Sequence, residues 1–227
     1  MALHERFGVA MDTDRMVAQF MDMVRIDSES GNEARFLEWL VPALDEVGAT
    51  AGFDTYGNLI ATLPALNSGA PPVLLSCHGD TVRPGVGITP VLQDGVIRSG
   101  GDTILGADDK AGIAEMLEAL RLAKVRPPLE VAISRQEETG LQGVKNLDFR
   151  LLKARRGFLL DNDTLDTIVI GGILKDTKKL TEQGIPGLRR LPAIGWLFRS
   201  ERTENSKNEL LIFITPRIVQ LDQRKLI

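Results

Sequence analysis

The first two thirds of the chain alternate between a helical and a strand-like spacing of apolar residues. Apolar residues recur at helical spacing in three stretches, each predicted to be an amphipathic helix: residues 13–26, 32–48 and 110–125. Pro42 lies inside the second stretch and is expected to kink or split that helix. Short apolar runs predict strands at 58–63, 72–77, 129–136 and 156–161, and a hairpin at 91–99. This alternation predicts an α/β domain built on a largely parallel sheet.

The pattern changes near residue 166. Two apolar runs, 166–174 and 209–219, flank a stretch rich in Gly, Pro and Arg, and no convincing helix lies between them. The charge changes at the same place. Residues 1–165 carry 24 acidic and 16 basic side chains, whereas residues 166–227 carry 7 and 11. We therefore expect two parts, a domain at 1–165 and a short β-rich C-terminal segment at 166–227.

The composition is that of a soluble globular protein. Apolar residues make up 43% of the chain and the net charge is −4, which excludes a largely disordered chain. The sequence shows neither a membrane-spanning apolar run nor a secretory signal, and its single Cys77 cannot form an internal disulfide. We expect a cytoplasmic protein without a membrane partner. The basic residues of the tail lack aromatic interleaving, so no nucleic-acid partner is expected either.

Candidate chemistry lies where the predicted strands end. In an open α/β sheet, ligands bind beyond the carboxyl ends of the strands. Four such positions carry histidine or acidic residues: His78-Gly79-Asp80, Asp108-Asp109, Glu137-Glu138 and Asp161-Asn162-Asp163.

A bound cation would explain this cluster, because several carboxylates at one edge repel each other unless something neutralises them. Imidazole with carboxylates suits zinc, and less commonly manganese or cobalt. Each element also has a structural explanation. A lone histidine can be a hydrogen-bonded core residue, an Asp pair before a helix can be a cap, and a Glu pair can be a solvated loop. The residues alone leave both interpretations open.

Several segments resemble a known family. CHGDTVRPG, ILGADDKAGIAEMLEAL, QEETGLQGVKNLD and GFLLDND resemble, in order and spacing, the peptidase T branch of the dinuclear zinc peptidases. IDSESGNE and FDTYGNLIATLP are similar to N-terminal segments of that family. The resemblance covers about residues 12–165. It implies a three-layer α/β/α catalytic domain that hydrolyses short peptides, in the manner of an aminopeptidase or tripeptidase, by metal-activated water.

The resemblance also implies roles for individual residues. His78 and Asp161 would bind a first metal, Asp108 would bridge two metals, and Glu138 would bind the second. The metal would be zinc, with cobalt or manganese as alternatives.

Two further acids would complete the catalytic machinery. Asp80 would orient the histidine ligand, and Glu137 would be the general base.

The chain departs from the family pattern in two ways. Its only histidines are His4 and His78, whereas the family has a further histidine ligand near its C-terminus. The family's lid domain, inserted after the strand that ends at Asp161, is also not recognisable. The first metal site keeps its full ligand set and the second does not, so we expect one tightly bound ion and an impaired peptidase.

The tail resembles a different family. The segment from DTIVIGGIL to ITPRIVQ, about residues 166–222, resembles the C-terminal part of a bacterial outer-membrane secretin of type II secretion and type IV pili. The chain is therefore interpreted as a truncated peptidase catalytic domain fused to a secretin fragment. Alternative functions are a secretin-like channel component, or a metal-binding but inactive fusion. The sequence does not predict an oligomeric state.

Overall fold

The computed structural model describes residues 11–161, 168–184 and 199–214. Its helices are α2 (Thr13–Val24), α3 (Ala34–Glu46), α4 (Ala107–Leu122), the short α5 (Gln142–Lys145) and the 3-10 helix η1 (Phe149–Leu151). Its strands are β1 (Thr50–Phe53), β2 (Leu59–Leu63), β3 (Val73–His78), β4 (Pro90–Gln93), β5 (Val96–Ser99), β6 (Leu129–Ser134), β7 (Arg156–Leu159), β8 (Ile168–Gly184) and β9 (Arg199–Ile214).

Seven strands form one mixed sheet in the order β1-β2-β6-β3-β7-β8-β9. Strand β3 runs parallel to both of its neighbours, β6 and β7, and the other pairs are antiparallel. The carboxyl ends of β6, β3 and β7 therefore meet at one edge, which is where the candidate site lies. Strands β4 and β5 form a separate hairpin.

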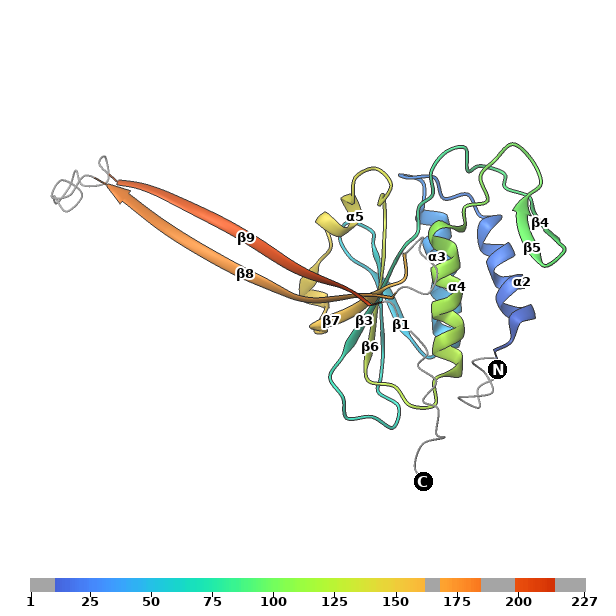
Figure 1. Ribbon diagram of the computed structural model, residues 1–227, viewed down its shortest axis with the longest axis horizontal. Coiled ribbons are helices and arrows are strands. Elements are labelled where there is room, and N and C mark those ends of the chain that lie inside the picture. Colours follow the sequence, from blue (N-terminus) through green and yellow to red (C-terminus); the bar gives the residue numbers. More distant parts are fainter. Residues whose placement is uncertain (1–10, 162–167, 185–198, 215–227) are drawn as a thin grey trace, which may run out of the picture.

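The hydrophobic core lies between the sheet and three helices. In Figure 1, α2, α3 and α4 lie on one side of the sheet and the short α5 on the other. Strand β6 is buried along its whole length, as expected for a central strand. The core brings together residues of α3, α4, β2 and β6, among them Phe36, Leu37, Leu40, Leu59, Ile113, Leu117, Val131 and Ile133.

The other face of the central strands is more open. A cavity of about 740 Å³ runs along it, between β3, β6 and β7 and the segment that contains α5 and η1. Val144 and Phe149 of that segment line the cavity and stay 38% and 41% exposed. At the carboxyl edge of the sheet the cavity reaches His78, Glu137 and Asp161, so it opens directly onto the candidate site.

The C-terminal strands form a long hairpin that projects from the domain (Figure 1). Strand β8 pairs with β7 between Val169 and Gly172, and this short stretch extends the main sheet. From Lys175 to Gly184, β8 pairs only with β9. The segment thus joins the sheet at its base and forms a two-stranded ribbon beyond it.

The predicted α/β class is confirmed, and every predicted helix and strand of the first part has a counterpart. The prediction of a largely parallel sheet is wrong, because only the pairs β3–β6 and β3–β7 are parallel and the other four pairs of this sheet are antiparallel. Antiparallel pairing adds β2 and β1 on one flank and β8 and β9 on the other, and β1 is mostly exposed. Within the described ranges, no helix is long and apolar enough to cross a membrane.

Helix α3 runs unbroken through Pro42, so the predicted split does not occur. Proline removes one backbone hydrogen bond, but Leu40, Ala43 and Leu44 beside it are buried in the core. Their packing outweighs that loss, because most of the stability of a protein helix comes from its buried face.

Candidate active site

His78 is the centre of the candidate site. It ends β3 and is 2% exposed. Its Nε2 lies 3.0 Å from Asp108 Oδ1 and 3.9 Å from Asp161 Oδ2. Its Nδ1 lies 3.4 Å from Asp80 Oδ1, within ion-pair distance, and has no hydrogen-bond partner in the part of the chain that the structure describes. The imidazole therefore lies between the buried carboxylate of Asp80 and two others, of which Asp108 is exposed and Asp161 is partly buried.

The two aspartates before α4, Asp108 and Asp109, differ in exposure and in hydrogen bonding. Gly106 starts this turn in the left-handed region, with φ +68°, and Asp108 and Asp109 then have non-helical backbone angles. This geometry leaves the side chain of Asp108 69% exposed beside His78. Asp109 is 3% exposed, and its Oδ2 accepts a hydrogen bond of 3.2 Å from the backbone N–H of His78. Neither carboxylate caps α4, so the structure does not support the cap interpretation of this pair.

Asp80 links the histidine to the glutamate loop. It is fully buried, and its Oδ2 accepts a hydrogen bond of 2.6 Å from the Ser30 hydroxyl. The backbone N–H groups of Glu137 and Glu138 donate to its two oxygens, at 2.8 and 3.2 Å. A single carboxylate thus touches His78 on one side and fixes the backbone of both glutamates on the other.

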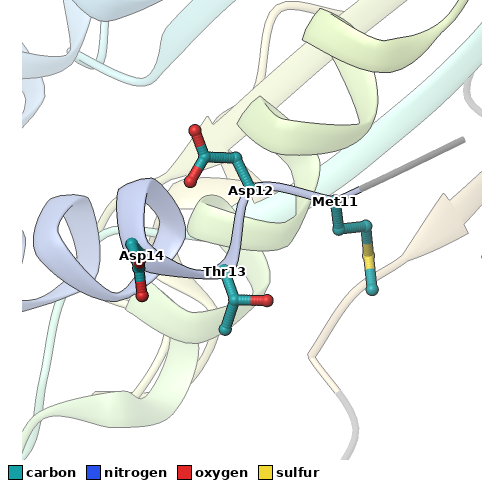
Figure 2. Close-up of a pocket in the computed structure, with 4 residues that line it drawn as sticks. All are labelled: Met11, Asp12, Thr13 and Asp14. Atoms are coloured by element: carbon teal, nitrogen blue, oxygen red, sulfur yellow. The ribbon is translucent and has the colours of Figure 1, made fainter.

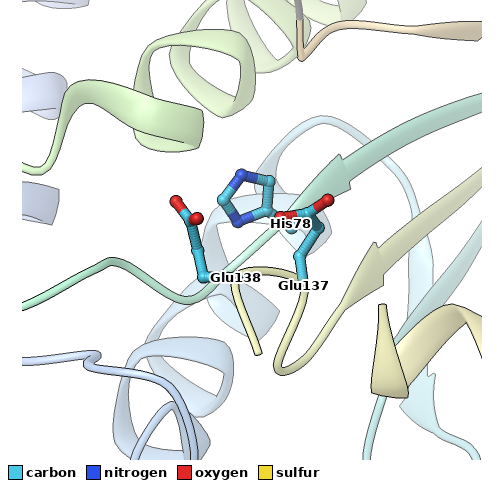
Figure 3. Close-up of side chains that lie close together, drawn as sticks. All are labelled: His78, Glu137 and Glu138. Atoms are coloured by element: carbon cyan, nitrogen blue, oxygen red, sulfur yellow. The ribbon is translucent and has the colours of Figure 1, made fainter. Parts of the chain in front are cut away.

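Both glutamate side chains face the histidine. Figure 3 shows Glu137 and Glu138 on either side of the His78 ring. Ligand atoms of these three residues lie within 4.8 Å of one another, as do those of His78, Asp108 and Asp161. The structure therefore brings together all six residues singled out in the sequence: five form two groups that share the His78 imidazole, and Asp80 lies beside that imidazole.

The charges of this cluster shift its proton affinities. Burial lowers the pKa of His78, but Asp80, Asp109, Asp108 and Asp161 outweigh burial and raise it to about 10. Burial, with repulsion from Asp161 and Asp108, raises the pKa of Asp109 to about 7. Without a metal, the site therefore holds a protonated histidine among its acids at neutral pH.

The pKa values of the other acids shift in opposite directions: those of Glu137 and Glu138 are raised, and that of Asp80 is lowered. Burial and repulsion from Asp161, Asp80 and Asp108 raise the pKa of Glu137, although His78 opposes this shift. The pKa of Glu138 is raised for similar reasons. Burial would also raise the pKa of Asp80, but its contacts with His78, Ser30 and the backbone of the glutamate loop lower it overall. Asp80 is therefore a firmly ionised anchor, and Glu137 has the raised pKa that suits a general base.

Sequence reasoning missed several residues of this site. It gave no separate role to Asp109, or to Ser30 and Glu33 in the segment SESGNE. That segment was singled out only because of a family resemblance. Its contacts join residues about 50 and 100 positions apart, and no local spacing could have shown them.

A second pocket at the start of α2 lacks comparable chemistry. It is lined by residues Met11 to Asp14 (Figure 2). Asp12 accepts a hydrogen bond from the N–H of Arg15 and so caps the helix, and it also pairs with the Arg15 side chain. The carboxylate of Asp12 thus has a structural role there.

Two family models match the sequence. The model of peptidase family M28 matches residues 58–162. A secretin model, described as a bacterial type II and III secretion system protein, matches residues 133–220.

Solved structures with the same fold include two peptidases. The aminopeptidase PepT of Bacillus cereus superposes with a TM-score of 0.66 and 34% identity, over 77% of this chain and 51% of that one. A tripeptidase of Staphylococcus aureus gives a TM-score of 0.65 and 31% identity over the same shares. The chain is similar to peptidase T. Its sheet and helices are the α/β catalytic fold of these enzymes.

Curated relatives include a peptidase T and a protein of unknown function. Peptidase T of Salmonella typhimurium is 27% identical, over 65% of this chain and 48% of its own length. An uncharacterized Bacillus subtilis protein, YqjE, is 37% identical, over 66% of this chain and 43% of its own length. The chain thus spans about half the length of the curated relatives that it matches.

Proposed function

We propose that this chain is a metal-dependent peptidase that hydrolyses short peptides. The observation that carries the proposal is the buried imidazole of His78, within reach of Asp108 and Asp161 on one side and of two glutamates on the other. The similarity to an aminopeptidase and a tripeptidase supports a short peptide with a free amino terminus as substrate.

The residues present fit one divalent ion. His78, Asp108 and Asp161 offer one nitrogen and two carboxylate oxygens, a mixed donor set that suits zinc and is compatible with cobalt or manganese. The group with the two glutamates depends on the same imidazole, whose other nitrogen faces Asp80. We therefore assign one ion to the first group, and Glu138 stays the proposed ligand of a second ion whose ligand set is incomplete. When bound, this ion would supply Lewis-acid polarisation of the peptide carbonyl and acidify a water molecule.

The protein's own groups would move the proton. Glu137 would accept a proton from the attacking water and deliver it to the leaving amine, and its raised pKa suits both steps. Asp80 would keep His78 oriented through Nδ1 and would hold the backbone of Glu137 in place. The cavity along the open face of the sheet reaches Glu137 and has room for a short peptide.

We also propose that the activity is impaired and that the chain has two parts. Only about half of a peptidase T is represented, and His78 is the only histidine near the site in the described residues. The secretin match reaches residue 220, beyond the end of the peptidase match at residue 162, and supports a secretin-like origin for the tail, although the two matches overlap at residues 133–162. We place the boundary near residue 165. A channel function for the tail rests on that match alone. We place the chain in the cytoplasm, which agrees with its unpaired Cys77.

Product analysis tests the proposed function. The purified chain is incubated with zinc, cobalt or manganese and a tripeptide, and separately with the same tripeptide acetylated at its N-terminus. Mass spectrometry should show a free N-terminal amino acid released from the first peptide only. Equal cleavage of both peptides would contradict the aminopeptidase type, and intact peptides with all three metals would contradict the function.

A further inference from the structure

The residue before the two active-site glutamates has an unusual backbone conformation. Gln136 has a φ of +50°, in the left-handed region that side chains other than glycine rarely adopt. Such a conformation costs free energy and persists only where surrounding contacts hold it. Because Gln136 directly precedes Glu137, its backbone angles set the direction in which the chain presents Glu137 and Glu138.

A buried carboxylate from a distant segment holds this loop. Glu33 is fully buried, and its Oε1 accepts a hydrogen bond of 3.1 Å from the backbone N–H of Gln136. Its Oε2 accepts two hydrogen bonds from the Arg135 guanidinium, at 3.1 and 3.0 Å. Glu33 is also the N-cap residue of α3, yet its side chain makes no capping bond. The carboxylate is directed to the glutamate loop instead of to its own helix.

Tyr56 also forms a hydrogen bond with Gln136. The Tyr56 hydroxyl donates a hydrogen bond of 2.6 Å to the Gln136 side-chain carbonyl, and the backbone carbonyl of Tyr56 accepts one of 3.3 Å from Arg135. The Gln136 backbone carbonyl accepts a hydrogen bond of 3.0 Å from the N–H of Gln142. The backbone N–H, the backbone carbonyl and the side-chain carbonyl of Gln136 are therefore all engaged.

From these contacts we propose that Glu33 and Tyr56 are positioning residues that hold Gln136 in its left-handed conformation and thereby aim Glu137 at the reacting water. Neither residue touches His78 or the acids around it in any described contact. They act through Gln136, while Asp80 fixes the next two backbone N–H groups. The inference rests on the proposed function, because it assigns these residues to the general base of that reaction.

The chain offers a matched pair of variants. Tyr56→Phe removes the hydroxyl that holds Gln136 and keeps the ring. Ser99→Ala is the control, because it removes a side-chain hydrogen bond of 2.8 Å to Thr103, next to the β4–β5 hairpin. Glu33→Gln is a second test variant that keeps the side-chain volume.

Two measurements then separate positioning from general stability. In the metal-free chain, amide hydrogen exchange of residues 136–138 should become about tenfold faster in Tyr56→Phe, with β6 unchanged, and Ser99→Ala should match the wild type. In the metal-loaded chain, kcat should fall about ten- to a hundredfold with KM nearly constant, because misplacement of a base by about 1 Å has effects of that size.

Failure of this positioning role can be distinguished from failure of the proposed function. If no peptide is hydrolysed, the function fails but the exchange measurement still decides the positioning role. Unchanged exchange at residues 136–138 in both Tyr56→Phe and Glu33→Gln would overturn the proposal. So would a higher KM with unchanged kcat, which would make Tyr56 a substrate contact.

Discussion

The backbone N–H of Glu137 donates a hydrogen bond of 2.8 Å to Asp80, whose same carboxylate oxygen lies 3.4 Å from His78 Nδ1. The loop after β6 and the end of β3 are therefore joined through one buried side chain. The parallel pairing of Cys77 with Ile133 and of His78 with Ser134 brings these two strand ends together. The register of the sheet thus sets the relationship between the proposed general base, Glu137, and the proposed metal ligand, His78.

Metal binding should depend on His78. We expect one equivalent of zinc by calorimetry for the wild type and none of comparable affinity for His78→Ala, because both candidate ligand groups share this imidazole. His4→Ala replaces the only other histidine in the sequence and should bind like the wild type. Two equivalents of similar affinity would show that another residue completes a second site.

The stability of the metal-free chain should fall as the pH rises from 7 to 9. The pKa of His78 is about 10 in the folded chain against 6.5 ordinarily, so the stabilisation from its proton is complete below about pH 6.5 and is lost progressively as the pH rises towards 10. The loss should approach about 1.4 kcal/mol per pH unit for one proton. The raised pKa of Asp109, about 7, acts in the same direction, but mostly between pH 4 and 7.

Urea unfolding in the presence of a chelator measures this slope. His78→Gln removes the titrating group and should flatten the curve above pH 7. A wild-type stability that stays level or increases between pH 7 and 9 would be incompatible with the raised pKa of His78.

Gly143 should not tolerate a side chain. A Cβ at this position would collide with the backbone of Arg135 and with the Asn58 side chain. Gly143→Ala should therefore lower the free energy of unfolding by about 1–3 kcal/mol, as overpacking generally does. Gly52→Ala is the control, because nothing lies within 4 Å of its added Cβ. Similar urea midpoints for the two variants would be evidence against this packing.

The hairpin of β8 and β9 should be the first part of the chain that proteases cut. Beyond Lys175, β8 pairs only with β9, and an isolated two-stranded ribbon is marginally stable in water. We expect limited proteolysis between Gly184 and Arg202 while a fragment of about the first 165 residues persists. Mass spectrometry of the time course would identify the cuts, and a protected tail would count against the prediction.

Local patterns predicted most of the elements but less of their arrangement. The helix at Ala107–Leu122 and the hairpin around Asp94 and Gly95 follow from apolar periodicity and turn chemistry. Strand direction is set by long-range pairing, so the antiparallel partners β2 and β8 could not be predicted in the same way.

For the candidate site, too, the sequence predicted some features and could not predict others. The acids at the strand ends were predictable, because parallel strands β6, β3 and β7 bring their carboxyl ends to one edge. The buried contacts that hold them were not. Glu33 lies 103 positions from Gln136, and its role depends on a backbone conformation that no spacing reveals. Asp109 looked like a helix cap and instead bonds the backbone of His78.

The function proposed for this chain is metal-dependent peptide hydrolysis with Glu137 as the base. The most direct measurement is the rate of tripeptide hydrolysis with added zinc, cobalt or manganese, compared between the wild type and Glu137→Gln at equal metal content. We predict a slow rate, well below the ordinary range of about 1 to 10³ s⁻¹, that is abolished by a chelator and by Glu137→Gln. Hydrolysis that survives both treatments, or that is absent with every one of these ions, would contradict the claim.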